Sequence, residues 1–211
     1  MRSRLFLVVA SGTKKAKLIK KTFEEEAIDP HWPVSFLRMH PNCIYIIDNG
    51  IGMDKGDAHN AFLRHATSKI YRDDDLFFIG TLGFRGEALA SISSVSQVTL
   101  ITKTRDMDYA SKLSVNGGVF GTVGATASQD GTFIEVRNLF FNTPARRKFL
   151  RRPKTEESEI TNFISRYILA HPSIKLRYTA NERIVFDNKG GDLLNAISCV
   201  YGAEIIPHIE P

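Results

Sequence analysis

The chain has 211 residues, of which 43% are hydrophobic, so it is long enough to bury one substantial core, and we expect one domain rather than two small ones. Its 28 lysines and arginines exceed its 23 aspartates and glutamates, which gives a net charge of +5. That charge permits attraction to phosphates but excludes a histone-like, fully basic nucleic-acid binder. The spacing of Cys43 and Cys199 is neither that of a disulfide framework nor that of a zinc site, which favours a reducing, intracellular location.

An apolar run at the start of the chain, residues 5–10, follows Arg2 and Arg4 in the order of a secretory signal peptide. The run is shorter than the usual apolar region of such peptides, about 7–15 residues, so we favour a buried strand over a signal peptide. No apolar run approaches the roughly 20 residues that span a bilayer. The sequence therefore predicts a soluble protein, in the cytoplasm if the source is bacterial and in the nucleus if it is eukaryotic.

The next part of the chain combines a strand, a glycine turn and a helix. Residues 44–47 are apolar and β-prone and stop at Asp48-Asn49-Gly50, the composition of a buried strand that ends in a turn. Apolar residues recur at spacings of three and four over 54–71, with Asp54 or Asp57 available as a cap. This pattern predicts a helix that runs into a polar segment.

The remainder alternates groups of strands with helices. We expect a helix over 87–95 and strands near 97–102, 109–115 and 132–137, separated by glycine turns. Thr143 before Pro144 predicts a hydroxyl cap at the start of a helix. The later elements are a helix over 156–170 with Ile160, Phe163, Ile164, Tyr167 and Ile168 on one face, a hairpin around Asn181-Glu182 and a helix over 192–201.

This order of elements favours an α+β fold. Strands that follow one another through short turns, with helices between groups of strands, form a two-layer sandwich of helices on a mixed, largely antiparallel sheet. A regularly alternating parallel array would need a helix between successive strands.

Three segments carry residues suited to a nucleotide. Asp48 ends a buried strand with glycines two and four residues later, so its carboxylate can accept hydrogen bonds from a planar ligand such as adenine; the alternative is an ordinary Asp-Asn-Gly turn. Residues 80–87 place three glycines before a helix, where amides and the helix dipole favour a polyphosphate, and a structural glycine loop is the alternative. Residues 65–69 supply two hydroxyls and an ammonium for a lid, or else form a solvated helix end.

Four segments, in this order, closely resemble the MutL family of GHKL ATPases, which act in DNA mismatch repair. They are DNGIGM at 48–53, RHATSKI at 64–70, IGTLGFRGEALA at 79–90 and VRNLFFNTPARRKFL at 136–150. The resemblance covers roughly residues 44–202, about three quarters of the chain. The third and fourth segments argue against other GHKL branches, such as histidine kinases, chaperones and gyrases.

The resemblance implies a GHKL, or Bergerat-type, ATP-binding fold with ATP and magnesium as cofactors. Asp48 would bind the adenine amine, Gly52 would line the base, and Thr132 would approach the adenine from its strand. The residues around the phosphates would be Thr67, Ser68, Lys69, Gly83, Phe84, Arg85 and Gly86.

The resemblance also implies partners. ATP binding would close the domain and promote homo- or heterodimerisation, which relays mismatch detection from a mismatch-recognition protein to downstream repair enzymes. DNA would be contacted through basic surfaces. The candidates for that contact are Arg146, Arg147, Lys148, Arg151 and Arg152, and a solvent-facing charge run is the alternative.

One family motif is not recognisable in this chain. The family's first helix carries Glu-x-x-x-Asn, in which the glutamate activates the attacking water and the asparagine binds magnesium. The closest match puts Thr22 in the general-base position and Glu26 in the magnesium position. Glu25 is then a candidate catalytic residue and Glu26 a candidate magnesium ligand, and a solvated helix face is the alternative for both.

Residues 1–43 otherwise differ from the family's usual beginning, because three prolines interrupt the expected helix and strand. We therefore expect an atypical N-terminal segment over 1–43, divergent or junctional, and an ATP-binding domain over 44–211. The family's second domain, which supplies a further lysine to the γ-phosphate, is not evident before Pro211. Two functions stay open: an ATPase module of mismatch repair, and a catalytically silent nucleotide-binding or scaffold module.

Overall fold

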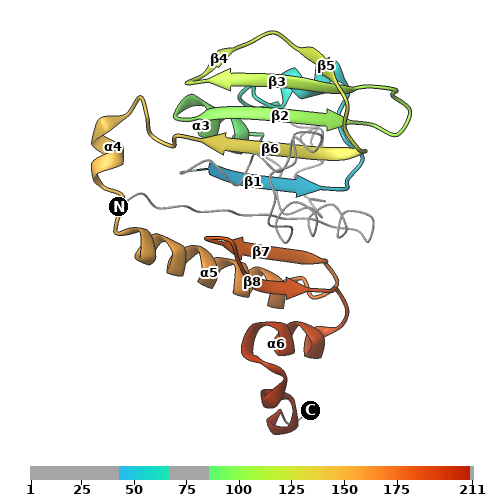
Figure 1. The fold of residues 1–211 in the computed structure, drawn as a ribbon, viewed down its shortest axis with the longest axis vertical. Helices are drawn as coiled ribbons and strands as arrows, with labels where there is room; N and C mark the ends of the chain where they lie inside the picture. Colours follow the sequence, from blue (N-terminus) through green and yellow to red (C-terminus); the bar gives the residue numbers. More distant parts are fainter. Residues whose placement is uncertain (1–42, 67–85, 210–211) are drawn as a thin grey trace. The chain divides into compact units, whose positions relative to one another are not determined.

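A computed structural model of the chain describes residues 43–66 and 86–209 (Figure 1). The chain divides into two compact units: a terminal unit, Met1–Gly50 with Phe149–Pro211, and a central unit, Ile51–Lys148. Within the described residues, no helix is both long and apolar enough to cross a membrane.

The central unit is built on an antiparallel sheet. Its strands are β2 (Gln97–Lys103), β3 (Ala110–Asn116), β4 (Val119–Phe120), β5 (Gly124–Thr126) and β6 (Gly131–Arg137). Strands β6, β2, β3 and β4 lie side by side in that order, and β5 pairs with β3 (Figure 1). The three long strands are those that the sequence predicts, each within one or two residues of its expected bounds.

The faces of this sheet follow from the register of β2. Directly opposite residues of an antiparallel pair lie on the same face, so Val98 and Leu100 share a face with their β6 partners Val136 and Ile134. Val98 and Leu100 are buried, whereas alternate residues of β3 are exposed. The sheet therefore has one core face and one polar face.

The described residues of the central unit form three helices: α2 (Lys55–Asn60), α3 (Ala88–Ser94) and α4 (Pro144–Lys148). Helix α2 contacts β3, and α3 contacts β2 and β3. Asp54 caps α2 by accepting a hydrogen bond from the Asp57 N–H at 2.7 Å, as predicted. The predicted helix over 54–71 is too long, because α2 ends at Asn60 and His65 has a left-handed φ of 64°.

The expected hydroxyl cap of α4 is also wrong. The Thr143 hydroxyl is buried and makes no hydrogen bond within the described part of the chain. The Thr143 carbonyl instead accepts a hydrogen bond from the Arg147 N–H at 3.1 Å. This short helix therefore starts at Pro144, as the sequence predicts, with a backbone hydrogen bond and without the Thr143 hydroxyl as its cap.

The terminal unit contains strand β1 (Cys43–Asp48), helix α5 (Pro153–Ala170), the hairpin β7 (Leu176–Ala180) and β8 (Arg183–Asn188), helix α6 (Leu193–Tyr201) and the 3-10 helix η3 (Ala203–His208). Alternate residues of β1 are buried, and the hairpin turns at Asn181 and Glu182, both with positive φ. Each of these elements was predicted except η3.

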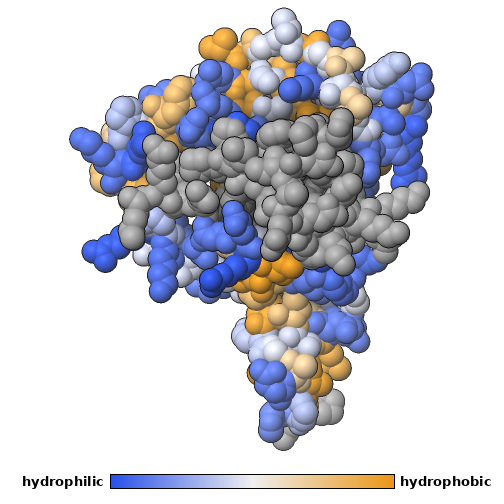
Figure 2. Space-filling view, in the orientation of Figure 1, coloured by the Kyte–Doolittle hydropathy of each residue, from blue (hydrophilic) through white to orange (hydrophobic). Residues whose placement is uncertain are grey.

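One face of α5, the hairpin and α6 enclose a common core. Its buried residues are Ile164, Ile168, Leu176, Tyr178, Ala180 and Ala196. Phe163 was expected on the same face of α5 but is 66% exposed, because it lies one residue off the ridge formed by Ile160, Ile164 and Ile168. Hydrophobic residues also reach the surface over α6, at the bottom of the view (Figure 2), where Leu193, Leu194 and Tyr201 are exposed.

Polar contacts fix the end of β8. The Asp187 carboxylate accepts a hydrogen bond from Arg177 at 2.8 Å and also pairs with Lys189. Burial raises the pKa of Asp187, but the bonds and charges of these two cations outweigh burial and hold the pKa below its usual range. The neighbouring Asn188 is buried and donates to the carbonyls of Pro172 and Ile174.

Candidate nucleotide site

Asp48 is the last residue of β1, and its side chain is half-buried. Its Oδ1 accepts a hydrogen bond from the Gly50 N–H at 2.7 Å, so the local geometry is that of an Asp-Asn-Gly turn. Oδ2 has no hydrogen-bond partner among the described residues. The turn therefore leaves one carboxylate oxygen able to accept from a ligand.

Gly52 lies against the backbone at the end of β2. Its φ is +73°, and a Cβ added there would lie 2.0 Å from the carbonyl oxygen of Lys103 in β2. Only glycine fits such a position, because it has no side chain and tolerates positive φ. The requirement for a glycine at this point of the motif is thus a packing requirement against the end of β2.

Thr102 links this turn to β6, and sequence reasoning missed it. Its hydroxyl, fully buried in β2, accepts a hydrogen bond from the Met53 N–H at 2.8 Å. The same hydroxyl lies 3.3 Å from the Gly131 carbonyl and 3.3 Å from the Thr132 hydroxyl. The central unit therefore brings Gly52 and Thr132 to one place, as the resemblance implies. The sequence signal that could have identified Thr102 is a hydroxyl residue on the apolar face of a predicted strand, because a buried hydroxyl needs hydrogen-bond partners.

The residues that flank segment 67–85 are in contact with each other. A Cβ on Gly86, whose φ is +63°, would lie 2.0 Å from the carbonyl oxygen of Ala66. His65 Nδ1 lies 3.3 Å from Glu87 Oε1. The backbones on the two sides of that segment thus meet directly, which requires glycine at position 86.

Several predicted site residues lie outside the described residues: Thr22, Glu25, Glu26, Thr67, Ser68, Lys69, Gly83, Phe84 and Arg85. Among the residues that the structure does describe, no group of three or more His, Cys, Asp or Glu side chains is placed to hold a metal ion. The candidate magnesium ligand, Glu26, falls in the other part of the chain.

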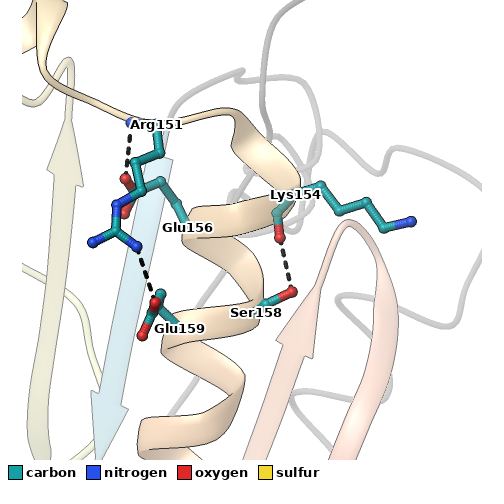
Figure 3. Close-up of polar contacts among 5 residues, drawn as sticks. All are labelled: Arg151, Lys154, Glu156, Ser158 and Glu159. Atoms are coloured by element: carbon teal, nitrogen blue, oxygen red, sulfur yellow. Dashed lines mark hydrogen bonds and ion pairs between the residues drawn. The ribbon is translucent and has the colours of Figure 1, made fainter.

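Four of the five candidate DNA residues fall into two groups, and the fifth, Arg152, is the N-cap residue of α5 (Pro153–Ala170). Arg146, Arg147 and Lys148 lie on α4, which has no buried residue. Arg151, in contrast, folds over the first turns of α5 (Figure 3): its N–H donates to Glu156 at 2.9 Å, and its Nη1 donates to Glu159 at 3.0 Å. Because Glu159 already pairs with the Arg151 guanidinium, Arg151 is less suited to a phosphate than the α4 cations.

Comparison with known proteins identifies the family. The family model described as "Histidine kinase-, DNA gyrase B-, and HSP90-like ATPase" matches residues 15–126, just over half of the chain. The chain belongs to this ATPase family. The match begins inside segment 1–43, and the domain boundary expected at residue 43 stays a prediction.

The relatives of this chain include DNA mismatch repair proteins MutL. The MutL of Thermoanaerobacter pseudethanolicus is 42% identical over 195 residues, which are 91% of this chain and 32% of that protein. The MutL of Listeria innocua is 47% identical over 203 residues, 93% of this chain and 34% of that protein. The MutL-type resemblance is confirmed, and the chain spans about a third of the length of these curated relatives.

Solved structures confirm the predicted GHKL fold. "Aquifex aeolicus MutL ATPase domain complexed with ADP" has a TM-score of 0.59 at 22% identity and covers 95% of this chain and 61% of that chain. "Crystal Structure of N terminal domain of a DNA repair protein" has a TM-score of 0.60 at 23% identity, over 96% of this chain and 52% of that chain. At such identities the likeness shows the fold alone.

Proposed function

We propose that this chain is the ATP-binding domain of a MutL-like protein, which couples ATP binding and hydrolysis to mismatch-repair signalling. The observation that carries the proposal is the Gly52 turn, packed on the end of β2 and joined through Thr102 to Thr132. This arrangement supports a closely fitted site for a planar base between a glycine turn and a strand.

In this proposal Asp48 accepts from the adenine amine through Oδ2, Gly52 lines the base, and Thr132 contacts the base from β6. A half-buried carboxylate with one oxygen that no described residue uses fits an amine donor. The phosphates are assigned to Thr67, Ser68, Lys69, Gly83, Phe84, Arg85 and Gly86. Magnesium, when bound, neutralises charge on the phosphates, and Glu26 is its proposed ligand.

The proposed partners follow from the resemblance to the MutL family. The chain would work with a mismatch-recognition protein, downstream repair enzymes and DNA, and would form a homo- or heterodimer when ATP binds. Such a role places it inside the cell, in the cytoplasm of a bacterium or the nucleus of a eukaryote. The Glu-x-x-x-Asn departure leaves a second function open, a catalytically silent nucleotide-binding or scaffold module of the same fold.

The rate of ATP hydrolysis distinguishes an ATPase module from a catalytically silent one. Because a threonine cannot act as a carboxylate base, we expect the chain to bind ATP with magnesium but to hydrolyse it about 10²–10⁴ times more slowly than a chain with a positioned base. Thr22→Glu should restore part of that rate in a single-turnover assay, whereas Thr22→Gln, of the same size, should not. Equal rates for both variants would show that Thr22 does not occupy the base position.

We also propose that α4 contacts DNA phosphates through Arg146, Arg147 and Lys148. Replacing all three with alanine should lower the slope of log affinity against log salt by about 0.9 per lost contact, about 2.7 in total. Arg151→Ala is the matched control, because its charge is already paired with Glu159. Duplex binding measured over a series of salt concentrations checks the prediction, and an unchanged slope in the triple variant would contradict it.

A further inference from the structure

Thr102 is the buried side chain that connects the two segments of the proposed base site. It is 0% exposed, and its register partner in β6 is Thr132, so both side chains lie on the same face of the sheet. Its hydroxyl has three partners: the Met53 N–H, the Gly131 carbonyl and the Thr132 hydroxyl.

The chemistry of these partners fixes where the protons lie. A hydroxyl has one donor and two acceptor positions. Met53 N–H can only donate and the Gly131 carbonyl can only accept, so the Thr102 proton points to Gly131. For the third contact to be a hydrogen bond at the same time, Thr132 must donate to Thr102. All three positions of the Thr102 hydroxyl are then used.

We propose that Thr102 is a positioning residue that selects adenine by holding the Thr132 hydroxyl as an acceptor. With its proton directed to Thr102, Thr132 presents only lone pairs to the nucleotide. Adenine carries an amine donor at the position where guanine carries a carbonyl acceptor, so the lone pairs attract adenine and repel guanine. This inference rests on the proposed function, which places the base beside Thr132.

The test measures the preference for one nucleotide over another rather than the stability of the chain. The dissociation constants of nonhydrolysable ATP and GTP analogues, each with magnesium, are measured for the parent chain, Thr102→Val and Thr102→Ser. Valine keeps the shape and removes the hydroxyl, so Thr132 can turn its proton toward guanine. We expect the preference for ATP over GTP to fall by roughly 3- to 10-fold in Thr102→Val, the effect of one lost hydrogen bond. Serine should retain the preference.

Thr99→Val is the matched control, because Thr99 is on the same strand but on the opposite face. It should leave the preference unchanged. If Thr102→Val weakens both analogues equally, Thr102 has only a structural role and the inference is overturned. If Thr102→Val does not fold, Thr102→Ala applies the same test with a smaller side chain. A parent chain that binds neither analogue would instead overturn the proposed function, and the inference with it.

Discussion

Gly52→Ala is expected to destabilise the chain by about 2–5 kcal/mol and to weaken ATP binding severely, because it adds a positive-φ penalty to a backbone overlap. The added Cβ would lie 2.0 Å from the Lys103 carbonyl oxygen and 2.4 Å from its carbon. These are backbone atoms of a paired strand, so they cannot rotate away as a side chain would. Urea unfolding and titration with an ATP analogue measure the two effects.

Gly124→Ala serves as the control for this substitution. Gly124 lies in β5, and a Cβ added there meets nothing within 4 Å. We expect it to change neither ATP binding nor stability by more than about 0.5 kcal/mol, the usual range for surface substitutions. If Gly52→Ala were as mild as this control, the Gly52 turn would not pack against β2 as described.

Asn188→Asp is expected to cost about 3–5 kcal/mol at neutral pH, the cost of a buried charge without a partner. Asn188 is only 3% exposed, and its Nδ2 donates to the Pro172 carbonyl at 3.1 Å and to the Ile174 carbonyl at 2.7 Å. The substitution keeps the shape but replaces the donor with a carboxylate oxygen that faces two carbonyl oxygens. Both hydrogen bonds are lost and the three oxygens repel one another.

The pH dependence of this variant gives the prediction a distinct signature. Burial among acceptors raises the pKa of the introduced carboxyl in the folded state above the unfolded value of about 3.9. Stability should therefore return as the pH falls through the raised pKa, because the protonated carboxyl can donate to one carbonyl. Asn188→Ala should lose stability equally at each pH, relative to the parent. Parallel stability curves for the two variants would contradict the account.

The sequence predicted the elements whose signals are local. Strand 44–47, the three long central strands and the Asn181-Glu182 hairpin follow from apolar runs and turn residues that act over a few positions. The Asp54 cap follows from one side chain at a helix start. These features need no knowledge of what the element packs against.

The features that were wrong or missed depend on the tertiary environment. Helix α2 ends at Asn60, before the left-handed turn at His65, although the helical spacing of apolar residues continues beyond both positions. Thr143 is at a capping position, yet its hydroxyl does not cap. The role of Thr102 depends on contacts that form only in the folded chain, because its partners Met53 and Thr132 lie 49 and 30 residues away in sequence. Long-range pairing of this kind has no local signature.

The candidate site was predicted chiefly from the order of family motifs. Physical reasoning on Asp48 and on the glycine loops left ordinary turns open as alternatives at each segment. The geometry adds the contacts that make Gly52 and Gly86 necessary, and it separates the paired Arg151 from the cations of α4. The phosphate and magnesium assignments still rest on the family motifs, because all of those residues except Gly86 lie outside the described part.

The central claim, that Asp48 binds adenine in an ATP site, is tested most directly by titrating a nonhydrolysable ATP analogue with magnesium into the parent chain and into Asp48→Asn. The amide retains an oxygen that accepts from the Gly50 N–H, but it places an NH₂ donor where Oδ2 would accept from the adenine amine. The account predicts that the parent binds and that the variant binds at least roughly tenfold more weakly, about 1.4 kcal/mol. Equal affinity of the two chains, or no binding by the parent, would contradict it.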